Sequence, residues 1–158
     1  MRLDRSFLFR HPAHFIALGF GAGLVPRAPG TWGTLVAFPI FAMANTGGHS
    51  SLLIAFAATF VVGWWASTVT GKALGVADHG GVVIDEIAAF MLVLVFSPPG
   101  ALWWAMAFGL FRLFDIAKPW PIRLADQQIK GGFGVMFDDL LAAGYSIAVL
   151  WIFKTALS

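Results

Sequence analysis

Acidic side chains recur in this sequence beside or inside apolar stretches, where a charge is hardest to accommodate. Seven of the eight Asp and Glu residues lie there, and only Asp4 stands apart: Asp78, Asp85, Glu86, Asp115, Asp126, Asp138 and Asp139. A carboxylate in a lipid environment costs several kcal/mol unless it has a partner. A divalent cation, which prefers oxygen ligands, is the partner that this set of residues favours.

The composition predicts where these carboxylates lie. The chain has 158 residues, of which 59% are hydrophobic and 11% are charged, whereas soluble domains carry about 25% charged residues. We therefore expect an all-α, polytopic helical membrane protein, with residues 1–158 forming a single domain. The absence of cysteine excludes disulfides and thiolate chemistry. A net charge of +2 gives no reason to expect a nucleic-acid partner, and we infer no obligate protein partner.

Apolar runs predict about five short transmembrane or membrane-embedded helices, over residues 32–45, 52–70, 82–96, 101–117 and 138–153. The Gly-rich segment 15–25, which Pro26 follows, is expected to be re-entrant or interfacial. The N-terminal stretch lacks a cleavage site of small residues, so we expect it to be retained. Basic and uncharged loops alternate, which predicts a multi-pass protein with its acidic clusters on the cytoplasmic face.

Four clusters on that face could carry chemistry. The first is GFGAGLVPRAPGTWGT, in which Gly30 and Gly33 flank Thr31. Thr31 is suited to capping the following helix, and the glycines allow backbone N–H groups to approach an anion, with Arg27 nearby. The alternative interpretation is a flexible loop at the membrane surface.

The second cluster is DHGGVVIDE, from Asp78 to Glu86. Asp85 and Glu86 are expected in the first turn of an apolar helix, pointing about 100° apart. The positive end of the helix dipole favours anions there, so the alternative to a metal site is ordinary placement of charge at a helix end. His79 is open between a catalytic base, a supporting residue and a bystander.

The third cluster, FRLFDIAKPWPIR, places Arg112, Asp115 and Lys118 on one predicted helix face. They could form a ladder of ion pairs, or Asp115 could bind a metal while the two cations hold phosphate oxygens. In the fourth cluster, GGFGVMFDDLLAAG, a glycine-rich turn is expected to lead into a helix whose first turn holds Asp138 and Asp139. Together, these carboxylates could bind one or two Mg²⁺ ions.

Phosphate ester chemistry fits carboxylates, Arg and Lys gathered at the level of lipid headgroups, because Mg²⁺ bridges phosphate oxygens and lowers the pKa of bound water. A divalent-cation transporter also places carboxylates among membrane helices. It predicts acids near the middle of the membrane, with access from both sides. A non-catalytic helical scaffold explains the apolar helices but not a one-sided acidic set.

At these four clusters the sequence resembles the phosphatidylglycerophosphatase A family of bacterial membrane enzymes. The matching stretches, in family order, are GFGAGLVPRAPGTWGT, DHGGVVIDE, FRLFDIAKPWPI and GGFGVMFDDLLAAG. One departure is at Ala89, where a glycine is expected after the Asp–Glu pair. The resemblance implies an Mg²⁺-dependent hydrolase of the bacterial inner membrane that converts phosphatidylglycerol phosphate, its lipid substrate, to phosphatidylglycerol and inorganic phosphate.

The expected roles of the site residues combine these clusters with the resemblance. The metal ligands are expected to be Asp78, Asp85, Glu86, Asp138 and Asp139. The catalytic residues are expected to be Asp85, Glu86, Asp115, Asp139 and His79. The substrate phosphate is expected to contact Arg27, Thr31, Arg112 and Lys118.

Overall fold

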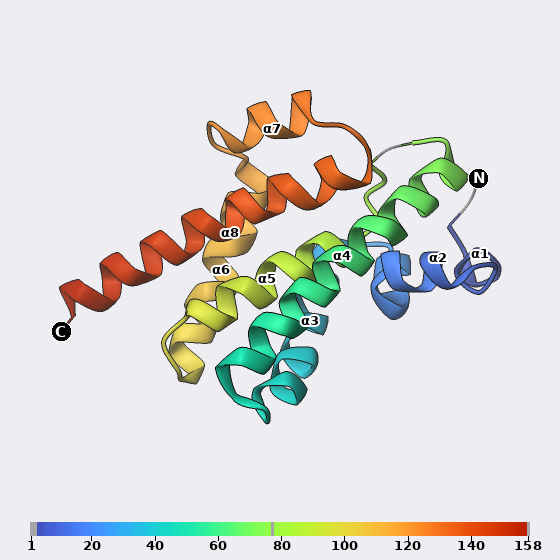
Figure 1. Ribbon diagram of the computed structural model, residues 1–158. Coiled ribbons are helices and arrows are strands. Elements are labelled where there is room, and N and C mark those ends of the chain that lie inside the picture. Colours follow the sequence, from blue (N-terminus) through green and yellow to red (C-terminus); the bar gives the residue numbers. More distant parts are fainter. Residues whose placement is uncertain (1–2, 77, 158) are drawn as a thin grey trace.

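The computed structural model describes residues 3–76 and 78–157, in which helices are the only regular secondary structure. Three short elements come first, followed by four longer helices and then α7 and α8 (Figure 1). Their bounds are α1 Arg5–Leu8, α2 Pro12–Ala17, the 3-10 helix η1 Gly19–Leu24, α3 Pro29–Asn45, α4 Gly48–Leu74, α5 Ile84–Phe96, α6 Ala101–Ala117, α7 Ile122–Gln128 and α8 Gly131–Ala156. The predicted all-helical class is therefore confirmed.

Helix α5 forms the centre of the structure, because α3, α4, α6 and α8 all pack against it. Its side chains from Ile87 to Met91 are all buried. Small residues permit the close approach: a Cβ at Gly33 of α3 would lie 2.6 Å from the Val83 Cβ atom. Where lipid surrounds a protein, such small residues let helices associate through van der Waals packing. Ala89 is buried in this core, so the departure from the family pattern concerns helix packing.

The longer helices run back and forth between two ends of the molecule (Figure 1). Helices α3, α5 and α8 begin at the end where α4 and α6 finish, and α1 and α2 lie at this end as well. The opposite end holds the α3–α4 and α5–α6 connections, which contain no charged residue. The charged connections therefore share one end, as the alternation of loops predicts.

Two helices are long and apolar enough to cross a membrane, α4 with 27 residues and α8 with 26. Only 22% of the apolar window of α4 and 44% of that of α8 are buried, so both present apolar surface outward. Helices α3, α5 and α6 have 17, 13 and 17 residues, which is shorter than the about 20 residues that a membrane span needs. The arrangement with five spans therefore stays a prediction.

The segment 15–25 does not form one continuous helix. It comprises the end of α2 and the 3-10 turns of η1, in which Phe20 and Gly21 have positive φ angles of 60° and 106°. His14 joins this region to α4, because its Nδ1 atom lies 2.9 Å from the Thr70 hydroxyl. Helix α2 packs on α4 and η1 packs on α3, so the segment consists of short turns, which fits the predicted re-entrant or interfacial character.

Candidate active site

Three carboxylates from two helices converge at the end of the bundle that holds the charged connections. Oxygens of Asp85, Glu86 and Asp139 lie within 4.8 Å of one another, and they form the group of possible metal ligands found among the described residues. Asp85 and Asp139 are only 8% and 3% exposed. One oxygen of each carboxylate is buried without a hydrogen-bond partner in the described part of the chain: Asp85 Oδ1, Glu86 Oε2 and Asp139 Oδ2.

Asp85 and Glu86 are positioned by the start of α5, in whose first turn both lie, as predicted. Because adjacent helical residues point about 100° apart, Asp85 enters the core while Glu86 faces α3 and α6. Gly30 of α3 makes room for Glu86, since a Cβ at Gly30 would collide with Glu86 Oε1. A glycine is therefore needed at this point of contact.

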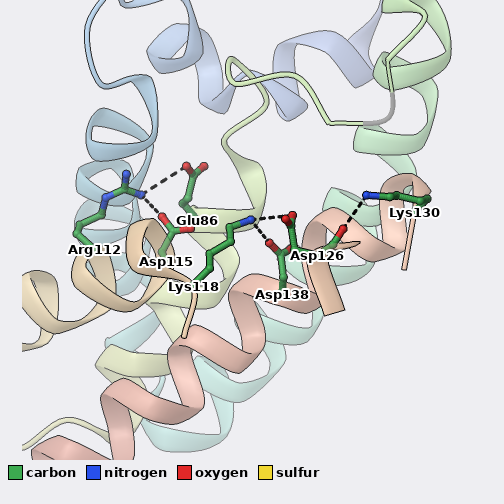
Figure 2. A network of polar contacts seen from close by, with 7 residues as sticks. All are labelled: Glu86, Arg112, Asp115, Lys118, Asp126, Lys130 and Asp138. Carbon is green, nitrogen blue, oxygen red and sulfur yellow. Dashed lines mark hydrogen bonds and ion pairs between the residues drawn. The ribbon is translucent and has the colours of Figure 1, made fainter. Parts of the chain in front are cut away.

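Arg112 of α6 contacts two of the predicted site carboxylates, Glu86 and Asp115, through its guanidinium group (Figure 2). Its Nη1 atom donates to Asp115 Oδ2 at 2.5 Å and lies 3.5 Å from Glu86 Oε1. The Arg112 Nε atom is buried and has no partner among the described residues. Of the two alternatives for this cluster, the structure shows the ion pair between Arg112 and Asp115, and the second contact of Arg112, with Glu86, connects α6 to the carboxylate group.

Lys118 does not continue this ladder. Helix α6 ends at Ala117, and Lys118 adopts a left-handed conformation with φ 41° and ψ 61°. The proline at position 119 disfavours right-handed helix at the residue before it. The predicted shared face is therefore wrong for Lys118.

The Lys118 ammonium turns instead to Asp126 of α7 and Asp138 of α8, at 2.8 and 2.5 Å (Figure 2). Burial alone lowers the pKa of Lys118, but the hydrogen bonds that its ammonium donates to Asp126 and Asp138 outweigh burial and raise this pKa above its ordinary value. The side chain therefore stays charged and fixes α7 to α8.

The predicted start of the last helix is also corrected. Helix α8 begins at Gly131, so the glycine-rich stretch forms its first turn, and Asp138 and Asp139 lie two turns further in. Glycines are needed there because α8 approaches α4 closely: a Cβ at Gly132 would lie 2.6 Å from the Thr68 backbone nitrogen. Of the two acids, Asp139 joins the carboxylate group and Asp138 pairs with Lys118.

The remaining predicted residues are not members of the group of three carboxylates found among the described residues. Thr31 is not a helix cap, because α3 begins at Pro29 and its N-cap is Ala28 in a left-handed conformation. Arg27 and Asp78 are exposed. The His79 Nδ1 atom accepts a hydrogen bond from the Gly81 N–H at 3.1 Å, which is a local contact within the loop.

Two residues that sequence reasoning left without a role support the site. Asp126 shares the Lys118 ammonium with Asp138, and the Tyr145 hydroxyl donates to the Trp120 carbonyl at 2.9 Å. Both contacts tie the turn after α6 to its neighbours. An acid among basic residues was the one available signal for Asp126, and no signal in the sequence marks Tyr145.

The three carboxylates fit a divalent cation. Three anionic side chains with unpaired buried oxygens repel one another unless a cation lies among them, and hard cations such as Mg²⁺ take oxygen ligands. Because an Arg lies at one edge and a Lys lies nearby, the site can hold an anionic group beside a cation. Phosphate is an anion that binds in this way.

Comparison with known proteins places this geometry in context. A family model described as phosphatidylglycerophosphatase A matches residues 15–154. A phosphatidylglycerophosphatase A of Haemophilus influenzae is 41% identical over 143 residues, covering 89% of this chain and 88% of the relative. That of Escherichia coli is 36% identical over 142 residues, covering 89% and 83%. A proposed phosphatidylinositol-3-phosphatase of Bacteroides thetaiotaomicron is 38% identical over 148 residues, covering 85% and 89%. No solved structure matches the chain.

Proposed function

This chain belongs to the phosphatidylglycerophosphatase A family, and we propose that it removes the terminal phosphate of phosphatidylglycerol phosphate with the help of Mg²⁺. The observation that carries the metal dependence is the convergence of Asp85, Glu86 and Asp139 with one unpaired buried oxygen on each. These residues would hold the ion. When bound, Mg²⁺ supplies a Lewis acid that polarises the phosphoryl group and acidifies water.

Arg112 and Lys118 are the residues best suited to hold the substrate phosphate. The Arg112 guanidinium has five N–H donors, and its Nε is without a partner in the described structure. The Lys118 ammonium has three donors, of which Asp126 and Asp138 take two. Both cations would oppose the charge that develops on the phosphate oxygens during transfer.

Asp115 is the group best placed to move a proton. It is bonded to Arg112, at the edge of the carboxylate group, and its side chain is 11% exposed, so water can reach it. Arg112 holds the Asp115 carboxylate in one orientation through the 2.5 Å contact. We infer that Asp115 accepts the proton of the attacking water.

The chain acts at a membrane in this proposal, as a multi-pass protein of the bacterial inner membrane with the site on the cytoplasmic face. Its support is the pair of long apolar helices and the collection of charged connections at one end of the bundle. The transporter alternative predicts carboxylates midway along the bundle. Asp85 and Glu86 instead begin α5, which favours chemistry near one surface.

The deciding experiment measures phosphate release by the detergent-purified protein from phosphatidylglycerol phosphate and from phosphatidic acid, in Mg²⁺ and in EDTA. We expect release that needs Mg²⁺ and favours phosphatidylglycerol phosphate. The variants Asp85→Asn and Asp139→Asn should abolish it. Asp4→Asn is the matched control: Asp4 Oδ1 caps α1 by accepting from the Phe7 N–H at 2.8 Å, and Asn caps a helix equally well.

Two results would contradict the proposal. Near-normal rates in Asp85→Asn and Asp139→Asn would show that the metal assignment is wrong. Folded protein that releases phosphate from neither lipid would exclude the phosphatase function itself, and uptake of labelled Mg²⁺ into vesicles would then test the transporter.

A further inference from the structure

The carboxylate group has a partly open side where the start of α3 meets the end of α6. Glu86, Arg112 and Asp115 retain 13%, 14% and 11% of their side-chain exposure, whereas Asp139 is almost completely covered. Gly30 marks this place, since a Cβ there would lie 3.0 Å from an Arg112 guanidinium nitrogen. A group that enters from this side meets Arg112 together with the two carboxylates that it contacts.

A second open side has a different character. Lys118 and Asp126 retain 26% and 34% of their side-chain exposure, and Asp78 is exposed. A small cavity of about 30 Å³ lies beside Asp78, Asp126 and Lys130, which is room for roughly one water molecule. Charged side chains gather on this side beside Ile129 and Val135, so it offers water a polar entry.

The seam between α3 and α6 becomes aromatic beyond Arg112. Both helices pack on α5 and only marginally on each other. At its far end the rings of Phe41 and Trp104 meet with centroids 6.0 Å apart, and midway the Phe90 ring contacts Phe38 and Phe108 at 5.2 and 5.8 Å. Aromatic rings therefore form the floor of the seam below the level of Arg112.

The α6 side of this seam is exposed and contains small residues. Ala105, Gly109, Arg112 and Ile116 recur at intervals of three or four, so they lie on one face of α6. Ile116 is 71% exposed one turn beyond Arg112, and a Cβ at Gly109 would meet nothing within 4 Å. On α3, Leu35 is 40% exposed. An acyl chain therefore has space along this face of α6, next to the Arg112 guanidinium.

We propose that the substrate reaches the carboxylates sideways from the bilayer through the α3–α6 seam, with its phosphate at Arg112 and its acyl chains along Gly109. The proposal rests on the proposed function, because it concerns the lipid that this function requires. Charge complementarity favours the occupant: a lipid phosphate joins an anion to apolar chains, and the seam joins Arg112 to an apolar strip. Water and released phosphate then exchange on the polar side.

The first test fills the seam without changing a polar residue. Gly109→Trp places its ring in open space on α6, and Gly144→Trp is the matched control, because a Cβ at Gly144 of α8 also meets nothing within 4 Å. Rates are compared for phosphatidylglycerol phosphate and for its deacylated headgroup, glycerophosphoglycerol phosphate. For the lipid, we expect kcat/KM of Gly109→Trp to fall about tenfold or more, since misplacing a substrate by about 1 Å costs on the order of a hundredfold. Rates on the headgroup should match those of Gly144→Trp.

The second test measures occupancy of the seam and needs no turnover. The natural chain lacks cysteine, so Gly109→Cys and Gly144→Cys each introduce a single thiol for alkylation by N-ethylmaleimide in EDTA. Phosphatidylglycerol phosphate should slow alkylation at position 109 and not at 144, and inorganic phosphate should protect neither position. If Gly109→Trp loses activity equally on both substrates, the alkylation result decides whether the lipid occupies the seam.

The outcomes separate this proposal from the proposed function. Wild-type protein that releases no phosphate from the lipid contradicts the function. If the wild type is active, two results contradict entry through the seam alone. One is a Gly109→Trp variant that hydrolyses the lipid as fast as Gly144→Trp does. The other is a Gly109→Cys thiol that the lipid does not protect from alkylation.

Discussion

Gly30 offers a test of the site that leaves every charged side chain in place. In Gly30→Ala the added methyl overlaps Glu86 Oε1 and lies 3.0 Å from Arg112, where ordinary contacts begin at 3.4 Å. Glu86 must therefore move by about 1 Å or more, and a displacement of that size in a reacting site costs on the order of a hundredfold in rate. Alanine favours helix over glycine by about 1 kcal/mol, so we expect the protein to stay folded.

The assay is the initial rate of phosphate release at increasing Mg²⁺ concentration. We expect Gly30→Ala to lower kcat/KM between about tenfold and a hundredfold and to raise the Mg²⁺ concentration needed for half-maximal rate. Gly144→Ala is the control, since its methyl meets nothing. In a double-mutant cycle with Glu86→Asp, the two losses should not add, because both disturb one carboxylate. A rate for Gly30→Ala within about twofold of wild type would refute the geometry.

Three further predictions concern stability in detergent. Asp139→Asn should raise the unfolding temperature in EDTA, because it relieves repulsion among three carboxylates. The variant should not gain the stability that we expect Mg²⁺ to give the wild type. A wild type that is more stable than the variant in EDTA would contradict this. Lys118→Met should destabilise by about 1–3 kcal/mol, below the 3–5 kcal/mol typical of fully buried pairs, because Lys118 is 26% exposed and leaves Asp138 unpaired. The pKa of Lys118 is raised from 10.5, so its contribution is fully present below that pH, and the difference between variant and wild type should be equal at pH 7 and pH 9. Burial lowers the pKa of His14 below 6.5, so wild type should lose stability as the pH falls through 6.5, and His14→Phe should show a smaller loss in parallel thermal unfolding curves.

Much of the site was predictable because acidic residues in apolar surroundings are rare. Asp85 and Glu86 were expected in the first turn of a helix and lie there. The choice between Asp138 and Asp139 was not predictable. Adjacent helical residues point in different directions, and which one faces α5 depends on where α8 begins and on where Lys118 lies.

The limits for the fold have a related physical reason. Apolar composition does not distinguish a helix that faces lipid from a helix that faces other helices. The segment 82–96 predicted a membrane-embedded helix, and α5 is embedded chiefly in protein. Lys118 shows the same limit locally, because its direction is set by the following proline and by two carboxylates that lie 8 and 20 residues further along the chain, on other helices.

The shortness of α5 has a consequence for the depth at which the proposed reaction would take place. Its 13 residues rise about 20 Å, whereas the hydrocarbon core of a bilayer is about 30 Å thick. A helix enclosed by its neighbours has no need to match that thickness, so its first turn can lie in a recess beneath the ends of α4 and α8. If the chain acts in a bilayer as proposed, the protein fixes the level that a headgroup has to reach. We then expect the rate to change with the thickness of the bilayer around it.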